Sequence, residues 1–339
     1  MINRHFIHAE FLKNQAQQGT TLYKYVFALS ILFLFVFSSH FCYAKTMVMK
    51  EDPAVVIVAF GTTTKASAAY DFFNAQLKEA MPQDYRSLKV EWAFSSEIVR
   101  QKANKQFKEA GIDKRYLSLP QVLSNLQDEG YRKIIIQPIV IFPGQEYDEI
   151  LSIVSSFRQL GLTITCGEAL LGTWENTFEV LNMLQKEFLS SSEGCNVIVS
   201  HGSPKTYASS NAVYLALDEF ISRKYENAYL GSIEGIPSRE LVLSAVKQCK
   251  LKKIRFIPFM YVAGDHVMND IMGDDPKELS WASEMKEAGF TVDTVYTDFQ
   301  GEKFYKGLGF YKEINRLLIE QLIKSLDKTI KPFSETSLE

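Results

Sequence analysis

The sequence predicts an α/β protein built from two similar lobes, each with a four-stranded parallel sheet flanked by helices. Apolar runs of strand length alternate with amphipathic segments of helical period along most of the chain. The second half of this alternation resembles the first. Continuous apolar strands joined by helices are typical of parallel sheets that are covered on both faces.

Eight apolar runs are the candidate strands. The first four are 54–60, 88–94, 133–141 and 162–168, and the second four are 196–200, 227–233, 253–261 and 290–296. Helical periodicity predicts helices over 66–80, 97–110, 146–160, 207–224, 238–249 and 310–329, and a longer helix over 173–190 between the two sets. The sequence leaves open whether the last helix packs on its own lobe or on a neighbouring subunit.

Two pairs of matching segments indicate an internal repeat. In the first pair, "VVIVAFGTT" matches "NVIVSHGSP", which aligns Phe60 with His201. In the second pair, "RKIIIQPIVIFPGQE" matches "KKIRFIPFMYVAGDH" at a shift of 120 positions, so that Glu146 aligns with His266. Lobes of this kind place functional groups at the carboxyl ends of their strands, beside the cleft between the lobes.

The start of the chain has the features of a secretory signal. Lys13 and Lys24 precede the apolar run 25–37, and small residues at Cys42 and Ala44 have the spacing that signal peptidase reads. We therefore expect residues 1–44 to be removed by cleavage after Ala44 and the mature protein to be periplasmic. Retention of the segment as a membrane anchor is the alternative.

Removal of residues 1–44 leaves 295 of the 339 residues, enough for two lobes. We expect an N-terminal lobe over 45–190 and a C-terminal lobe over 191–339, with the boundary near the long connecting helix.

Composition excludes several classes of function. The net charge of −3 comes from mixed charges without a basic stripe, which argues against nucleic-acid binding. Neither GxxxxGK[ST] nor GxGxxG occurs, so no nucleotide is expected. Beyond the leader, Cys166, Cys195 and Cys249 are odd in number and lack CxxC spacing. We expect each to be a small buried residue rather than part of a disulfide framework.

The only histidines after the leader end two of the predicted strands. His201 and His266 each adjoin a glycine at such an end, and Glu234 ends the strand that lies between them in sequence. In a parallel sheet these ends can converge, giving two imidazoles and a carboxylate. That set suits cobalt, iron, nickel or zinc with coordination positions left open, and the same groups can transfer protons. A cleft-edge carboxylate that caps a helix is the alternative for Glu234.

At these residues the sequence resembles a known family. The segments "VIVSHGSP", "GSIEGIPS" and "PFMYVAGDHVMND" resemble the three metal-site segments of the anaerobic sirohydrochlorin cobaltochelatases of the CbiK type, which are class II chelatases related to ferrochelatase. In the first lobe "VIVAFGTT", "WAFSSEIVR" and "IFPGQEYDEI" resemble the corresponding family segments. The resemblance covers about residues 54–330.

The resemblance implies two flavodoxin-like (Rossmann-like) lobes around a tetrapyrrole cleft, and ATP-independent insertion of Co²⁺ into sirohydrochlorin, a step of cobalamin biosynthesis. His201 matches the first metal-site histidine and base of the family, Glu234 its acidic partner, and His266 the second histidine ligand. Fe²⁺, Ni²⁺ and Zn²⁺ stay open as alternative metals, because the same ligands accept them.

Six further residues are expected to contact the tetrapyrrole. They are Phe60, Gly61, Thr62, Glu146, Tyr147 and Gly202. Glu146 is expected to line the side of the cleft opposite the histidines, where it could relay metal or protons. A carboxylate at the exposed start of a helix is the alternative reading of Glu146.

The apparent export signal does not fit a cobalamin pathway in the cytoplasm, so other functions stay open. One is a periplasmic haem or metal carrier derived from a chelatase, and another is a two-lobed solute-binding protein that performs no chemistry. Binding of haem and assembly into a homo-oligomer are also left open by the sequence.

Overall fold

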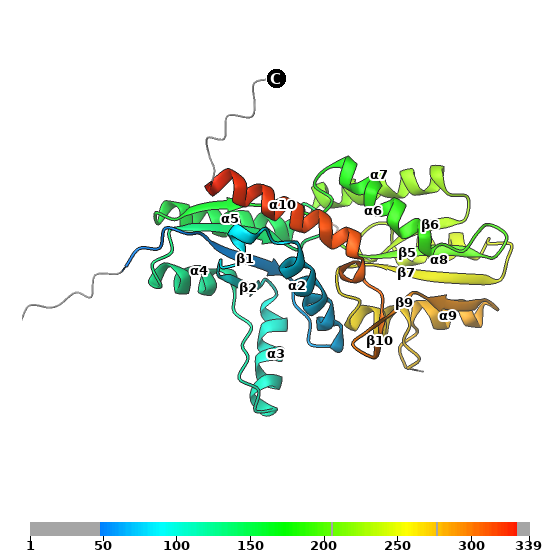
Figure 1. Ribbon diagram of the computed structural model, residues 1–339. Coiled ribbons are helices and arrows are strands. Elements are labelled where there is room, and N and C mark those ends of the chain that lie inside the picture. Colours follow the sequence, from blue (N-terminus) through cyan, green and yellow to red (C-terminus); the bar gives the residue numbers. More distant parts are fainter. Residues whose placement is uncertain (1–47, 205, 276, 331–339) are drawn as a thin grey trace, which may run out of the picture. The chain divides into compact units, whose positions relative to one another are not determined.

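Two four-stranded parallel sheets carry the fold, one in each half of the chain (Figure 1). The strands are β1 (Ala54–Ala59), β2 (Val90–Phe94), β3 (Lys133–Pro138), β4 (Thr163–Cys166), β5 (Cys195–Gly202), β6 (Ala228–Glu234), β7 (Lys253–Phe259) and β8 (Thr291–Thr294). Their orders are β2-β1-β3-β4 and β6-β5-β7-β8, with every pairing parallel. The equivalent orders confirm the predicted α/β class with two similar sheets.

This computed structural model describes residues 48–330, apart from 205 and 276. The predicted leader, residues 1–44, lies outside the described residues, so the cleavage after Ala44 stays a prediction. In the described part of the chain, no helix combines the length and the apolar character that crossing a membrane would require.

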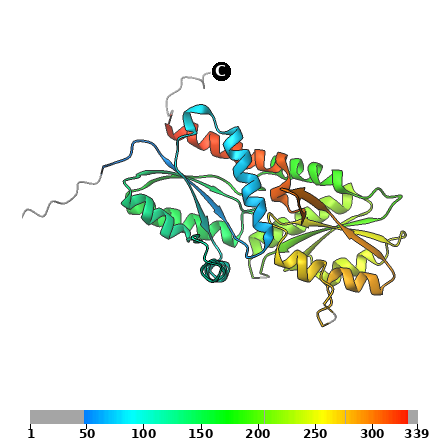
Figure 2. The same cartoon turned by 60° about the horizontal axis from the view of Figure 1, so that its bottom comes forward.

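Helices flank both sheets in the positions that the hydrophobic periodicity predicts (Figures 1 and 2). The predicted ones are α2 (Ala68–Ala80), α3 (Glu97–Glu109), α5 (Gln145–Gln159), α6 (Trp174–Leu184), α7 (Ala208–Lys224), α8 (Arg239–Val246) and α10 (Lys312–Ile330). The structure adds α4 (Leu119–Asp128), α9 (Trp281–Glu287) and a π-helical turn at Val267–Ile271.

The central strand β1 shows why an apolar run without alternation becomes a strand here. Successive side chains of a strand point to opposite faces, and both faces of this sheet are covered. Val55 and Ile57 belong to one buried cluster, whereas Val56 and Val58 belong to another. The first cluster continues into Ile198 of the second sheet, so the two halves share one hydrophobic core.

The last helix, α10, packs against the first sheet of its own chain, on β3 and β4, and against α2. Gln321 accepts a hydrogen bond from Gln137 Nε2 at 3.4 Å, and the hydroxyls of Thr329 and Thr165 lie 3.1 Å apart. These contacts run across the lobe boundary expected near residue 190, and that boundary stays a prediction.

A β-hairpin follows β8 and was not expected from the sequence. It consists of β9 (Tyr296–Phe299) and β10 (Glu302–Tyr305), which pair antiparallel. Gln300 and Gly301 form its two-residue turn with φ of 51° and 83°, the backbone region that hairpin turns of this length require. The predicted strand 290–296 therefore ends two residues early, because the chain turns into the hairpin.

The expectation that no cysteine takes part in a disulfide was wrong. Cys195 and Cys249 form a disulfide with their Cα atoms 6.3 Å apart, whereas Cys166 is free. The parallel register places Cys195 beside Ile254, at the start of β7, and Cys249 precedes that residue by only five positions. Spacing along the sequence could not reveal this pair, because the sheet brings the two positions together.

We predict that replacing both bridged cysteines by serine lowers the free energy of unfolding by about 2–4 kcal/mol, because the bond closes a loop of 54 residues. Urea unfolding of the protein lacking residues 1–44 measures the change, and Cys166→Ser is the control. Dithiothreitol should destabilise the parent protein but leave the double variant unaffected. Three free thiols in the denatured, unreduced protein would contradict the disulfide.

Candidate metal-binding site

The two histidines predicted to share a metal lie side by side. The ring centroids of His201 and His266 are 4.9 Å apart, with the ring planes at 75°. Both side chains are partly accessible to solvent. His201 is the penultimate residue of β5, and His266 follows the neighbouring strand β7, so the sheet brings together residues that are 65 positions apart in sequence.

Glycine at position 202 makes the end of β5 possible. Gly202 has φ +87° and pairs in register with Glu234 at the end of β6. A Cβ at this position would collide with the backbone carbonyl of Glu234, and φ in this region already disfavours other residues. The glycine therefore allows His201 and Glu234 to lie on adjacent strand ends.

The surroundings of His201 favour a neutral imidazole. Burial lowers the pKa of His201, and the positive charge of a protonated His266 lowers it further. The Gly202 carbonyl, 3.3 Å from Nδ1, and the charges of Glu234 and Asp270 act in the opposite direction. A neutral imidazole offers a nitrogen lone pair to a metal or a proton.

A carboxylate orients the second imidazole. Asp270, one turn after His266, lies 2.6 Å from its Nδ1, which leaves Nε2 as the nitrogen free to bind a metal. Both side chains are well exposed, at 38% for His266 and 47% for Asp270.

Glu234 lies close enough for its charge to raise the pKa of His201, and its side chain is exposed. However, the residues that the structure describes contain no group of three or more His, Cys, Asp or Glu side chains arranged to hold a metal. The pairing of the two imidazoles is thus established by the geometry, whereas a ligand set that includes Glu234 stays a prediction.

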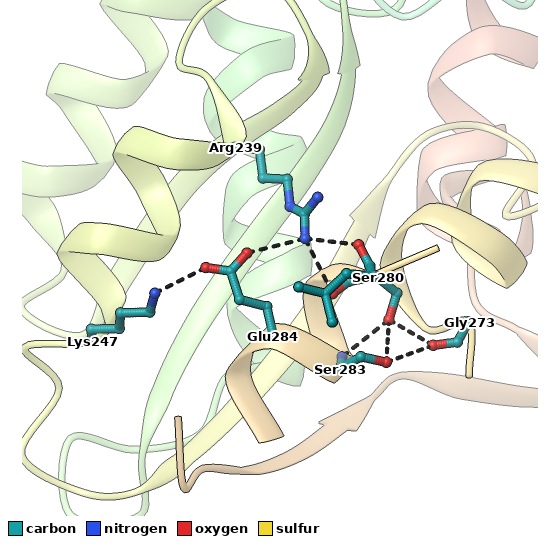
Figure 3. A network of polar contacts seen from close by, with 7 residues as sticks. Arg239, Lys247, Gly273, Ser280, Ser283 and Glu284 are labelled. Carbon is teal, nitrogen blue, oxygen red and sulfur yellow. Dashed lines mark hydrogen bonds and ion pairs between the residues drawn. The ribbon is translucent and has the colours of Figure 1, made fainter. Parts of the chain in front are cut away.

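The segment that follows His266 is anchored by a polar network (Figure 3). Ser280 and Ser283 both donate hydrogen bonds to the carbonyl of Gly273, at 2.6 and 3.1 Å. Arg239 donates to the Ser280 carbonyl and pairs with Glu284 at 3.1 Å. The loop between the π-helical turn and α9 is thereby tied to α8, which supports the turn that carries His266 and Asp270.

In the first half of the chain, the position equivalent to His266 holds a carboxylate with an unusual pKa. Burial raises the pKa of Glu146 to about 7, although a hydrogen bond from Ser95 Oγ at 2.6 Å favours the charged form. The nearby charge of Glu149 raises it further. Glu146 is therefore poised to exchange a proton near neutral pH.

Tyr214 links Glu146 to the histidine side. Burial raises the pKa of the Tyr214 hydroxyl, and the charge of Glu146 raises it further. The Gly202 backbone and the Ser200 hydroxyl lower it. The charge of Glu146 and the groups at the end of β5 thus act on one phenol. The sequence contained no signal for Tyr214, which lies in no motif. Ser95 lies in the segment "WAFSSEIVR", but nothing in that segment singles it out from its neighbours.

The other predicted substrate contacts are divided between the site and the core. Phe60 is 46% exposed, and its ring centroid lies 6.4 Å from that of His201. Gly61, with φ +98°, donates its N–H to the Tyr70 hydroxyl, and Thr62 is buried. Tyr147 packs against the core of the first sheet and donates to the Gly167 carbonyl at 3.0 Å, so the structure does not bring it to the histidines.

The halves contact each other through two equivalent glycines. Gly264, after β7, lies against Thr62 and Thr64 in the loop after β1, where a Cβ would come within 3.0 Å of the Thr62 hydroxyl. Gly144, after β3, lies against Ser210 at the start of α7, with no room for a Cβ. These reciprocal contacts bring the carboxyl ends of both sheets toward each other.

The chain is similar in sequence to known cobaltochelatases. The curated relatives include the sirohydrochlorin cobaltochelatase of Salmonella typhimurium, 25% identical over 280 residues that cover 82% of this chain and 98% of the relative. Another is the sirohydrochlorin cobaltochelatase CbiKC of Nitratidesulfovibrio vulgaris, 26% identical over 259 residues, or 75% and 85% of the two chains. Among solved structures, SirB from Bacillus subtilis with Fe³⁺ shares the fold, with a TM-score of 0.53 at 12% identity, over 83% of this chain and 98% of that one.

The model of the cobalt chelatase (CbiK) family matches residues 53–327, which include both strand-end histidines, Glu234 and Glu146. The match extends over both sheets and α10. The chain therefore belongs to the cobalt chelatase (CbiK) family.

Proposed function

We propose that this protein inserts Co²⁺ into sirohydrochlorin without ATP, and that the metal enters the macrocycle from the paired histidines. The observation that carries the proposal is the contact of the His201 and His266 rings at the ends of neighbouring strands. Membership of the cobalt chelatase family and the names of the two curated relatives support the reaction and the tetrapyrrole substrate.

In this proposal the metal is a substrate that must be both captured and released. His201 and His266 each supply one nitrogen, and the exposed carboxylate of Glu234 completes the set. Because the protein supplies only a few ligands, coordination positions on the metal stay open. Pyrrole nitrogens can bind there and replace the protein ligands. Fe²⁺, Ni²⁺ and Zn²⁺ suit the same ligands, so we assign Co²⁺ from the relatives rather than from ligand type.

Insertion of a divalent ion displaces a proton from each of two pyrrole nitrogens. His201 is held neutral, so it can accept one of these protons, and Glu234 beside it can take part in the transfer. We assign Glu146 as an acceptor in the other half of the chain, because its pKa of about 7 allows both uptake and release of a proton near neutral pH.

We further propose that the protein acts outside the cytoplasm, after cleavage of residues 1–44. The Cys195–Cys249 disulfide supports an oxidising compartment, since such bonds are rare in reducing ones. In that compartment, the product would serve the handling of metal or haem rather than a cytoplasmic cobalamin pathway.

We predict that His201→Ala and His266→Ala each lower the rate of Co²⁺ insertion by about 10²–10⁴-fold, because each removes a metal ligand or base. Tetrapyrrole absorbance measures the rate, with both substrates in excess over the protein. Glu79→Gln, a change at an exposed residue of α2, is the control, and urea unfolding checks that each variant is folded. A parent-like rate in either histidine variant would refute the assignment of that histidine to the metal site. A parent protein that binds sirohydrochlorin without turnover would be a carrier rather than an enzyme.

Glu146 provides a test by pH. Its folded-state pKa of about 7 exceeds the ordinary value of 4.5, so the folded protein binds more protons than the unfolded chain between these pH values. Glu146→Gln should match the parent in stability below pH 4.5 and become the more stable of the two as pH rises to 7, with a constant difference above that. Urea unfolding across this range tests the prediction, with the exposed Glu79→Gln as control; a difference independent of pH would contradict it.

Fractionation of cells that express the full chain tests the location. We expect the protein in the periplasmic fraction with Lys45 as its first residue. Sequencing of the N-terminus decides between a cleaved leader and a retained anchor. Recovery of the intact chain from the cytoplasm would overturn the proposed export.

A further inference from the structure

A small pocket lies beside the segment that carries His266. Its volume is about 230 Å³, and its walls come from the loop after β1, the end of the β7 segment, the π-helical turn and the β9–β10 hairpin. The lining residues are Lys65, Ala66, Ala263, Met268, Tyr296, Lys303, Phe304 and Tyr305. Ala263 precedes His266 by three residues and Met268 follows it by two, so the segment that carries His266 also lines the pocket.

The pocket has the charge of an anion site. Two of its lining residues are lysines, two are tyrosines and none is a carboxylate. Among the described residues, neither Lys65 nor Lys303 forms an ion pair within 4.0 Å. The acidic Asp71 and Glu302 line a separate hollow on the other side of Lys65 and Phe304.

The lysines are held in place by the hairpin. Lys65 donates a hydrogen bond to the Lys303 carbonyl at 3.0 Å and lies over the ring of Phe304 at 5.1 Å. Lys303 lies over the ring of Tyr296 at 4.1 Å, and that ring stacks on Tyr305 at 5.1 Å. An ammonium group has three N–H donors, so both lysines retain donors for a ligand.

The walls also combine the two kinds of surface that an alkanoate needs. Phe304, Ala263 and Met268 provide apolar surface for methylene groups, and the ammonium groups and phenols provide donors for a carboxylate. Asp274 opposes an anion, since its charge contributes to the raised pKa of Tyr305, although burial is the larger cause.

We propose that this pocket binds one carboxylate side chain of the tetrapyrrole, with Lys65 and Lys303 as the residues that recognise it. This inference rests on the proposed function. Sirohydrochlorin carries acetate and propionate groups around its ring, and the segment that carries His266 also supplies Ala263 and Met268 to the pocket. The hairpin thereby selects an acid-rich tetrapyrrole and positions it over the metal.

Binding of metal-free sirohydrochlorin, followed by its fluorescence, tests the inference separately from turnover. We expect Lys65→Gln and Lys303→Gln each to raise Kd about threefold and the double variant about tenfold, the range for exposed ion pairs. In Co²⁺ insertion the effect should fall on KM rather than kcat. Lys303→Arg should retain most of the affinity. Added salt should weaken binding to the parent more than to the double variant.

Lys78→Gln is the matched control, since it removes an exposed lysine from the far end of α2. A double variant with the Kd of the parent, or a loss equalled by Lys78→Gln, would overturn the inference. A parent protein that binds sirohydrochlorin but does not insert metal would refute the proposed reaction alone, because the ratio of Kd values still decides the role of the lysines. A parent protein that binds no tetrapyrrole would refute both.

Discussion

The reciprocal contact between the two halves is the constraint on which the rest of the structure depends. Each half places the glycine after its third strand against the other half: Gly144 against Ser210, and Gly264 against Thr62 and Thr64. Aromatic contacts reinforce the pattern, with Tyr70 stacked on Tyr261 and Phe142 against Tyr214. Since these residues lie at or near the carboxyl ends of the strands, the contact concentrates the chemistry-bearing positions of both sheets in one region.

The two halves share a topology but not a chemistry. The end of the central strand carries Phe60 in the first sheet and His201 in the second, and the position after the third strand carries Glu146 and His266, respectively. The second half therefore presents two neighbouring imidazoles. The first presents an aromatic ring and a carboxyl group that titrates near neutral pH. In the proposed reaction, a flat substrate between such ends would meet the paired imidazoles on one side and the Glu146 carboxyl group on the other.

Much of the fold could be predicted from the sequence, because the inner strands of its sheets are buried on both faces and its helices are amphipathic. All eight strands of the parallel sheets lie where continuous apolar runs predict them. The hairpin was missed because β9 and β10 are four residues each. Their turn also begins with Gln300, whereas Asn, Asp or Gly is typical at that position. The disulfide was missed because register, not spacing, unites Cys195 and Cys249.

The sequence by itself determined which residues could carry the chemistry, since His201 and His266 are the only histidines after residue 44 and both end apolar runs. Only the tertiary structure decided that their rings meet, that Asp270 orients one of them, and that Lys65 lies beside Lys303. The physical reason is that periodicity reports which side chains are buried, and it does so residue by residue along the chain. Contacts between distant residues depend instead on strand order, on register and on the glycines that let two parts of the chain approach closely.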